Sequence, residues 1–156
     1  MYQKLQVGRA LSVIKSDTIG IPSPSVESIS SSATGTTSNK LVDSAGDFVN
    51  RNIKVGDIVY NTTDSTVATV TAVNVNGTEL TISADIMASG EAYRIFRPDG
   101  NQGCVLYVGG AGDIKVETVG GDEVVFAGVL AGSFIPVQVV KLFSTSTTAT
   151  NVVALW

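Results

Sequence analysis

One stretch of the sequence, VGGAGD at 108–113, has the residue types of a loop that binds phosphate groups. A glycine-rich loop can do this when a strand precedes it and a helix follows, because the helix N-terminus then faces the phosphate. Here the third glycine of a G-x-G-x-x-G pattern is replaced by Lys115, and IKVETV alternates as a strand does. A GK[ST] pattern is also absent. We therefore interpret 109–113 as a turn of a β-meander whose glycines allow positive φ, and expect no bound nucleotide.

Acidic residues offer little further chemistry. Calcium needs six to eight oxygen ligands at defined spacing, and Asp113, Asp122 and Glu123 supply too few, so we expect the two aspartates to cap turn amides. Asp64 begins a DST stretch, but it lies in a polar loop without partners. No carboxylate sits among aromatic residues as in a sugar cleft. We expect no catalytic residue, no metal site, no cofactor and no small-molecule substrate.

The amino-acid composition argues against several classes of function. The 156 residues carry a net charge of −4, and the ten basic residues do not cluster, so we expect no nucleic-acid partner. The chain has no histidine, which removes the Ser-His and Cys-His catalytic pairs. Its single cysteine, Cys104, cannot form an intrachain disulfide and is expected to be a small buried side chain. Neither a signal peptide nor an apolar run long enough to span a membrane is visible, so we expect a soluble chain in a reducing compartment.

The middle of the chain, 40–98, has the pattern of a small SH3-like or OB-like barrel. Its clearest feature is a hairpin over 67–82, turned by Asn76-Gly77. Period-two alternation predicts one face with Val67, Thr69, Thr71 and Val73, an opposite face with Ala68, Val70 and Ala72, and a second strand with Leu80 and Ile82. Before the hairpin, 45–48 fits either one helical turn or a loop that carries buried Leu41, Phe48 and Val49.

Five further strands are predicted in the last third, at 104–109, 113–119, 123–129, 134–145 and 150–156. In the second of them Ile114, Val116 and Thr118 face one way, and Lys115 and Glu117 the other, as in an antiparallel sheet with one wet face. Proline cannot donate to a strand ladder, so Pro136 predicts a sheet edge or a bulge.

The N-terminal part looks less regular. Pro22 and Pro24 favour extended backbone, so 1–25 is predicted to be an arm that either lies on a neighbouring subunit or is solvated. Residues 30–39, SSSATGTTSN, have the composition of a flexible linker. We therefore expect an all-β chain: an antiparallel, jelly-roll-like β-sandwich with an inserted SH3/OB-like small β-barrel. The expected parts are the arm and first strands at 1–33, the inserted barrel at 34–97, and the main sandwich at 98–156.

The last third resembles small virion proteins of tailed bacteriophages and gene transfer agents, most closely the family of head-spike base proteins. Five features carry the resemblance: an LYVGGAGD strand and turn, a GG turn, a V-x-F-x-x-V-x-A-G segment, a P-V-x-V strand and an ending of the type T-x-T-T-A-x-x-I-V-A-L. They lie here at 106–113, 120–121, 124–132, 136–139 and 146–155. The SDTIGIPSP arm resembles the family more weakly, and the segment 34–97 is an insertion relative to short members. This insertion itself resembles small barrels of phage structural proteins.

The resemblance implies a non-enzymatic structural protein on the phage head. Such a protein binds the major capsid protein and other virion proteins, as a decoration or as a spike or fibre base, in a homo-oligomer that we expect to be a trimer or pentamer. The alternative is a structural component of the tail, neck or baseplate. A third hypothesis is a carbohydrate-binding module, and a fourth is an enzyme. The candidate interface residues are Ile21, Pro22, Pro24, Phe134 and Trp156. Trp156 fits either the core of the chain or a subunit contact.

Overall fold

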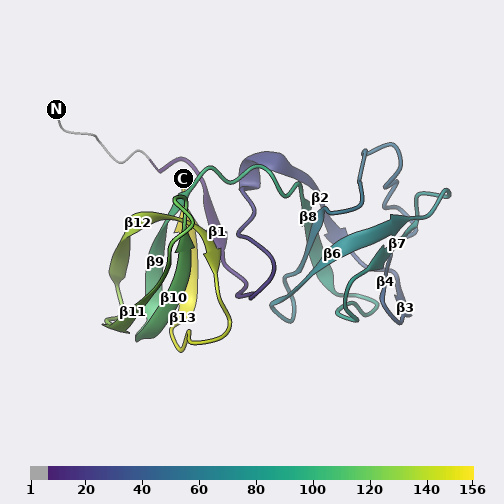
Figure 1. The fold of residues 1–156 in the computed structure, drawn as a ribbon. Helices are drawn as coiled ribbons and strands as arrows, with labels where there is room; N and C mark the ends of the chain where they lie inside the picture. Colours follow the sequence, from purple (N-terminus) through teal and green to yellow (C-terminus); the bar gives the residue numbers. More distant parts are fainter. Residues whose placement is uncertain (1–6) are drawn as a thin grey trace. The chain divides into compact units, whose positions relative to one another are not determined.

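In residues 7–156 the regular structure is antiparallel β-strand, with one short 3-10 turn (Figure 1). A computed structural model describes residues 7–156 and is consistent with the expected β-sandwich class. The elements are β1 (Ala10–Ser12), η1 (Pro24–Val26), β2 (Glu27–Ser32), β3 (Gly35–Thr37), β4 (Lys40–Val42), β5 (Ile58–Asn61), β6 (Thr66–Val73), β7 (Glu79–Ile82), β8 (Ala92–Phe96), β9 (Cys104–Gly110), β10 (Gly112–Thr118), β11 (Glu123–Val129), β12 (Ser133–Leu142) and β13 (Thr150–Leu155). Within this described part, no helix has the length and apolar character to cross a membrane.

The strands divide into two compact units, each with its own core. One unit consists of residues 7–25 together with 101–156, and the other of residues 26–100. The second unit begins at Val26, before the boundary expected at residue 34, because β2 pairs with β8 along its length. We call the first unit the sandwich unit and the second the barrel unit.

The barrel unit closes through one continuous segment, 27–37. Its seven strands follow the order β2-β8-β5-β6-β7-β4-β3, so β2 and β3 lie at opposite ends of that order. These two strands are consecutive in the chain: Ala33 N–H donates to Glu91 O at 2.9 Å, and Thr34 N–H donates to Val42 O at 2.8 Å. The same segment therefore completes both edges of the sheet, and the unit forms a small closed barrel, which leaves no long free edge.

This closure corrects the interpretation of SSSATGTTSN as a flexible linker. Its residues form the end of β2 and all of β3, and Ala33 between the two strands is only 3% exposed. Small polar side chains suit this position because the strand bends sharply where it passes from β8 to β4. The composition of the stretch resembles that of a linker, whereas its backbone pairing is that of a strand.

The predicted hairpin is present as β6 and β7, with Gly77 at a φ of 70° in its turn. Ala68, Val70, Leu80 and Ile82 are buried as the alternation predicts. A bulge between Val70 and Ala72 then shifts the register, so that Val73 rather than Ala72 packs against the core. Before the hairpin, Leu41 in β4 and Phe48 in the following loop are fully buried as expected. Val49 is 50% exposed, so the prediction that it is buried is wrong.

Asp43 is a buried polar centre of the barrel unit and follows β4 directly. Its Oδ2 accepts hydrogen bonds from the Tyr93 hydroxyl at 2.7 Å and the Ser31 hydroxyl at 2.8 Å, and its Oδ1 accepts from Ala45 N–H at 2.9 Å. Burial raises the pKa of Asp43, but these hydrogen bonds more than offset that effect, so the pKa lies below its usual 3.8. The same burial, together with Asp43, raises the pKa of Tyr93. The ionised carboxylate thus links β2, β4 and β8.

The sandwich unit is a single curved sheet in the order β1-β13-β9-β12-β10-β11 (Figure 1). All five strands predicted in the last third are present, and β1 from the N-terminal region pairs with β13. Ile114 and Val116 are fully buried in the core, and their neighbours Lys115 and Glu117 form ion pairs on the other face. Pro136 falls in the register shift of β12 against β9, which confirms the predicted bulge.

The stretch VGGAGD is a kink between strands rather than a hairpin turn. β9 ends at Gly110 and β10 begins at Gly112, but the two strands do not pair, because β12 lies between them. The glycines are required by close approach of the 148–151 backbone: a Cβ at Gly109 would lie 2.7 Å from Asn151 O, and one at Gly112 would lie 2.5 Å from Ala149 N. The interpretation as a meander turn is therefore wrong for 109–113. It is right for 119–122, which joins the paired strands β10 and β11.

Candidate functional site

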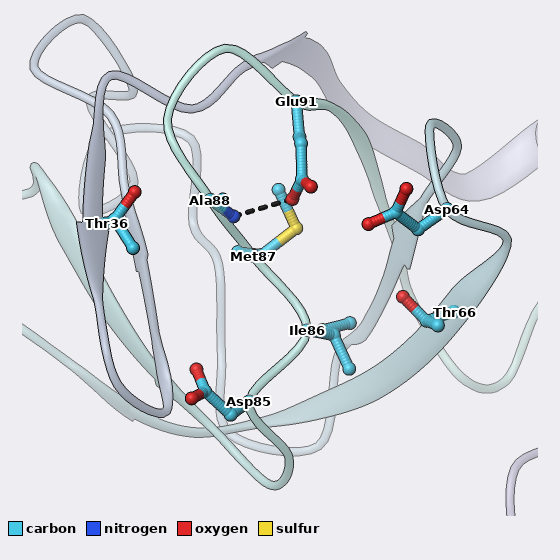
Figure 2. A pocket seen from close by; sticks show the side chains of 8 residues that line it. All are labelled: Thr36, Asp64, Thr66, Asp85, Ile86, Met87, Ala88 and Glu91. Carbon is cyan, nitrogen blue, oxygen red and sulfur yellow. Dashed lines mark hydrogen bonds between the residues drawn. The ribbon is translucent and has the colours of Figure 1, made fainter.

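The barrel unit carries an acidic pocket of about 350 Å³ between the 85–91 loop and the 61–66 turn (Figure 2). Three carboxylates line it, from Asp64, Asp85 and Glu91, together with the hydroxyl-bearing side chains of Thr36 and Thr66. Figure 2 shows the side chains of Asp64 and Glu91 pointing toward one another, with Met87 behind Glu91.

Asn61, at the end of β5, connects the two sides of the pocket by hydrogen bonds. It is fully buried, and its Nδ2 donates to Ile86 O at 2.6 Å and to Glu91 Oε2 at 2.9 Å. Its Oδ1 accepts from Thr63 N–H at 2.9 Å and from Asp64 N–H at 3.1 Å. All hydrogen-bonding groups of this amide are therefore used, which fixes the turn carrying Asp64 against the loop carrying Glu91.

Asp64 and Glu91 form a like-charged pair that favours sharing one proton. A hydrogen bond with Glu91 and the negative charge of Glu91 raise the pKa of Asp64 above its usual 3.8. Glu91 is held in place by Ala88 N–H, which donates to Oε2 at 2.6 Å.

The third carboxylate of the pocket is engaged elsewhere. Asp85 accepts from Ser38 Oγ at 3.1 Å and from Asn39 N–H at 2.9 Å. Among residues 7–156, no group of three or more histidine, cysteine, aspartate or glutamate side chains is placed to hold a metal ion. The Asp64–Glu91 contact was not visible in the sequence, where Asp64 lies in a polar loop and its partner belongs to a different loop.

We expect Asp64→Asn to stabilise the protein at neutral pH. A raised carboxyl pKa means that the folded state binds the proton more tightly than the unfolded chain does, so wild-type stability falls as the pH rises through the folded pKa. The variant lacks this loss, and its gain in melting temperature over wild type should disappear below about pH 3.8. Thermal melts from acid to neutral pH test this, with Asp122→Asn in an exposed turn as the control. A pH-independent gain, or no gain, would contradict the paired titration.

The sandwich unit carries a second candidate site, an apolar surface around β11. From Val119 to Phe134 no residue is buried. The apolar members of this stretch are well exposed, at 53% for Val119, 50% for Val125, 72% for Leu130 and 55% for Phe134. We call residues 119–134 the β11 surface.

Both faces of β11 contribute to this surface. Val124 and Phe126 lie opposite Val116 and Ile114, so they are on the core-facing side, yet Val124 is still 40% exposed. Val125 lies opposite Lys115 on the outer side. Because β11 is the last strand of the sheet order, its outward edge has no partner strand among residues 7–156. The surface thus combines exposed apolar side chains with an unpaired strand edge.

Charge is absent from the core of this surface. Between Glu123 and Lys141 the sequence contains no charged residue. Two ion pairs border it, Lys115 with Glu123 at 2.8 Å and Lys141 with Glu117 at 2.7 Å, and both lysines also lie over the Phe143 ring. Asp122 lies exposed in the turn before β11. Natural proteins usually protect an exposed sheet edge with charges, prolines or short strands, whereas β11 has seven residues, no proline and a single charge at its first residue, Glu123.

Three of the five candidate interface residues are buried within the chain. Ile21 is 3% exposed, belongs to the core of the sandwich unit, and donates its N–H to Val140 O at 2.8 Å. Pro22 and Pro24 are also buried, and Pro24 O accepts from Arg9 Nη1 at 3.2 Å. The interpretation of 7–25 as a free arm is therefore wrong, because this segment supplies β1 and part of the core. Residues 1–6 of the predicted arm lie outside the described residues.

The other two candidates differ from each other. Trp156 packs against the core of the sandwich unit and donates from Nε1 to Asn101 Oδ1 at 3.1 Å, which favours the core over a subunit contact. Phe134 is half exposed, stacks edge-to-face on Tyr107 with ring centroids 5.5 Å apart, and belongs to the β11 surface. Val125 and Leu130 of the same surface were not selected from the sequence, where exposed and buried strand valines look alike.

The remaining sequence candidates have structural roles. Asp113 Oδ1 accepts from Gly128 N–H at 2.8 Å, which supports the bulge in β11. Glu123 pairs with Lys115, and Asp122 lies exposed in the 119–122 turn. Cys104 is buried as predicted; burial raises the pKa of its thiol to about 12, and Sγ donates to Val139 O at 3.2 Å.

Comparisons of the chain with protein-family models, with curated proteins and with solved structures found no match.

Proposed function

We propose that this chain is a non-enzymatic structural protein of a bacteriophage virion. In this proposal it is located on the head, where it binds the major capsid protein as a decoration or as a spike or fibre base. The observation that carries a role in assembly is the β11 surface, which has no buried residue and no charged residue after Glu123. The resemblance of 106–155 to head-spike base proteins supports the choice of the virion as the site of that assembly.

Exposure of the apolar residues of this surface to water costs free energy. Each square ångström of apolar surface removed from water contributes about 25 cal/mol, and large contiguous apolar patches usually mark protein interfaces. An unpaired edge next to such a patch offers backbone donors and acceptors that a partner strand can satisfy. The apolar patch and the unpaired strand edge are both suited to binding another protein, and neither needs a catalytic group.

A tail, neck or baseplate position is the second candidate. The same exposed edge and the same pair of rigid β-units would serve there, since both positions need only protein–protein surfaces. The two positions therefore differ in the partner that covers the surface, and particle images separate them.

Immunogold electron microscopy of purified particles of the encoding phage tests the proposal. The antibody is raised against the barrel unit, and particles lacking the gene serve as the control. We expect gold on heads, and gold confined to vertices for a spike base. Gold on tails would replace the head position with the second candidate. If the protein is undetectable in particles dissociated with denaturant, the virion role is wrong.

A further inference from the structure

We propose that a second copy of this chain covers the β11 surface, by antiparallel pairing of β11 with its counterpart around a two-fold axis. The inference deepens the proposed function and rests on it only for the biological setting of the contact. The pairing extends the six-stranded sheet of one copy into that of the other.

The two edge strands of the sandwich unit, β1 and β11, differ in length and in the charged residues beside them. At one end β1 has three residues, follows Arg9 and is followed by chain that folds back into the core at Ile21. At the other end β11 has seven residues and no charge after Glu123. A head-to-tail ring built by sheet extension would need two open edges, whereas a two-fold contact needs only one. The structure therefore favours a dimer over the expected trimer or pentamer.

Self-pairing of β11 places no like charges together. In an antiparallel pair centred on Phe126, Glu123 of one copy lies opposite Val129 of the other, so the two Glu123 side chains lie at opposite ends. Val125 lies opposite Ala127, and the two Val125 side chains are diagonal neighbours on one face. The central residues Val125, Phe126 and Ala127 thus meet apolar residues of the other copy.

The number of exposed residues on the surface matches the size of one side of a standard interface. The chain exposes 7909 Å² over its 156 residues, so sixteen residues of average exposure present about 800 Å². One partner of a standard interface contributes about 800 Å². Thirteen of these sixteen residues are exposed, and none is buried.

The mass of the full chain in solution tests the pairing. Light scattering should give twice the chain mass of 16.1 kDa for wild type and the single chain mass for Val125→Glu. Val125 is half exposed opposite Lys115, so the glutamate is tolerated in the folded monomer. The matched control is Val75→Glu, at a valine that is 91% exposed in the barrel unit, and it should remain dimeric. Circular dichroism confirms that each variant is folded.

Mixing two variants with opposite charges at Val125 tests the register in which the two β11 strands pair. Val125→Lys alone should also be monomeric, and mixing it with Val125→Glu should restore a dimer, since the two side chains are diagonal neighbours across the axis. A monomeric wild type, a wild-type mass other than two chains, a dimeric Val125→Glu or a mixture that stays monomeric would each overturn the proposal. These outcomes are independent of the immunogold result: a monomer that labels virions leaves the proposed function intact, and a dimer absent from virions leaves the pairing intact.

Discussion

Asp43→Ala is expected to lower the free energy of unfolding of the barrel unit by about 3–5 kcal/mol. The substitution leaves the hydroxyls of Tyr93 and Ser31 and the N–H of Ala45 without their acceptor. Tyr93 is fully buried, so its hydroxyl cannot turn to water instead. A buried donor that loses its partner costs about 1–3 kcal/mol by itself, and bonds to an ionised acceptor are the stronger kind.

Urea unfolding followed by circular dichroism measures this loss. Trp156 is the only tryptophan and lies in the sandwich unit, so its fluorescence should show a transition that shifts less. Asp85→Ala removes an exposed acceptor of two hydrogen bonds and is the control, with a loss below about 1 kcal/mol. Because the folded pKa of Asp43 is lowered, the difference from wild type should shrink as the pH falls through that pKa. A loss equal to that of the control would refute the role of Asp43.

Gly112→Ala is expected to destabilise the sandwich unit by about 3 kcal/mol. A Cβ at this position would lie 2.5 Å from Ala149 N and 2.7 Å from Thr148 Oγ1. Those atoms hold the kink together: Thr148 N–H and Ala149 N–H donate to Asp113 O at 2.9 and 3.1 Å, and Asp113 N–H donates to Thr148 Oγ1 at 2.8 Å. Backbone atoms cannot turn aside as a flexible side chain can, so the bonds must stretch.

The fluorescence of Trp156 is the sensitive probe for this variant, because it belongs to the affected unit. Gly8→Ala is the matched control, since a Cβ at Gly8 meets no atom within 4 Å, and it should unfold with wild type. If Gly112→Ala also unfolded with wild type, close approach of the 148–151 backbone would not be the reason for glycine in the VGGAGD kink.

Local pattern was sufficient to predict the strands with alternating apolar residues. Ile114 and Val116 in β10, and Leu80 and Ile82 in β7, are buried where period two places them. Pro136 marked its bulge because a missing N–H acts at its own position. These features depend on the residue and its immediate neighbours, which a sequence displays directly.

The errors concern features that depend on distant parts of the chain. The stretch 30–39 is polar and small, and only its pairing with β8 and β4 makes it a strand. Ile21 resembles an arm residue until Val140 provides its acceptor. The Asp64–Glu91 pair joins two loops through Asn61, and no local signal relates them. The exposure of Val125 follows from the position of β11 at the sheet edge, which the strand pattern does not contain.

The central claim is that another protein chain covers the β11 surface in the functional state. Hydrogen–deuterium exchange of the β11 amides tests it most directly, with the interior strand β9 as the internal reference. We expect these amides to exchange slowly in the assembled wild-type protein and much faster in Val125→Glu, while β9 exchanges equally slowly in both. Equally fast exchange of β11 in both proteins would show that the edge stays open to solvent and would contradict the claim.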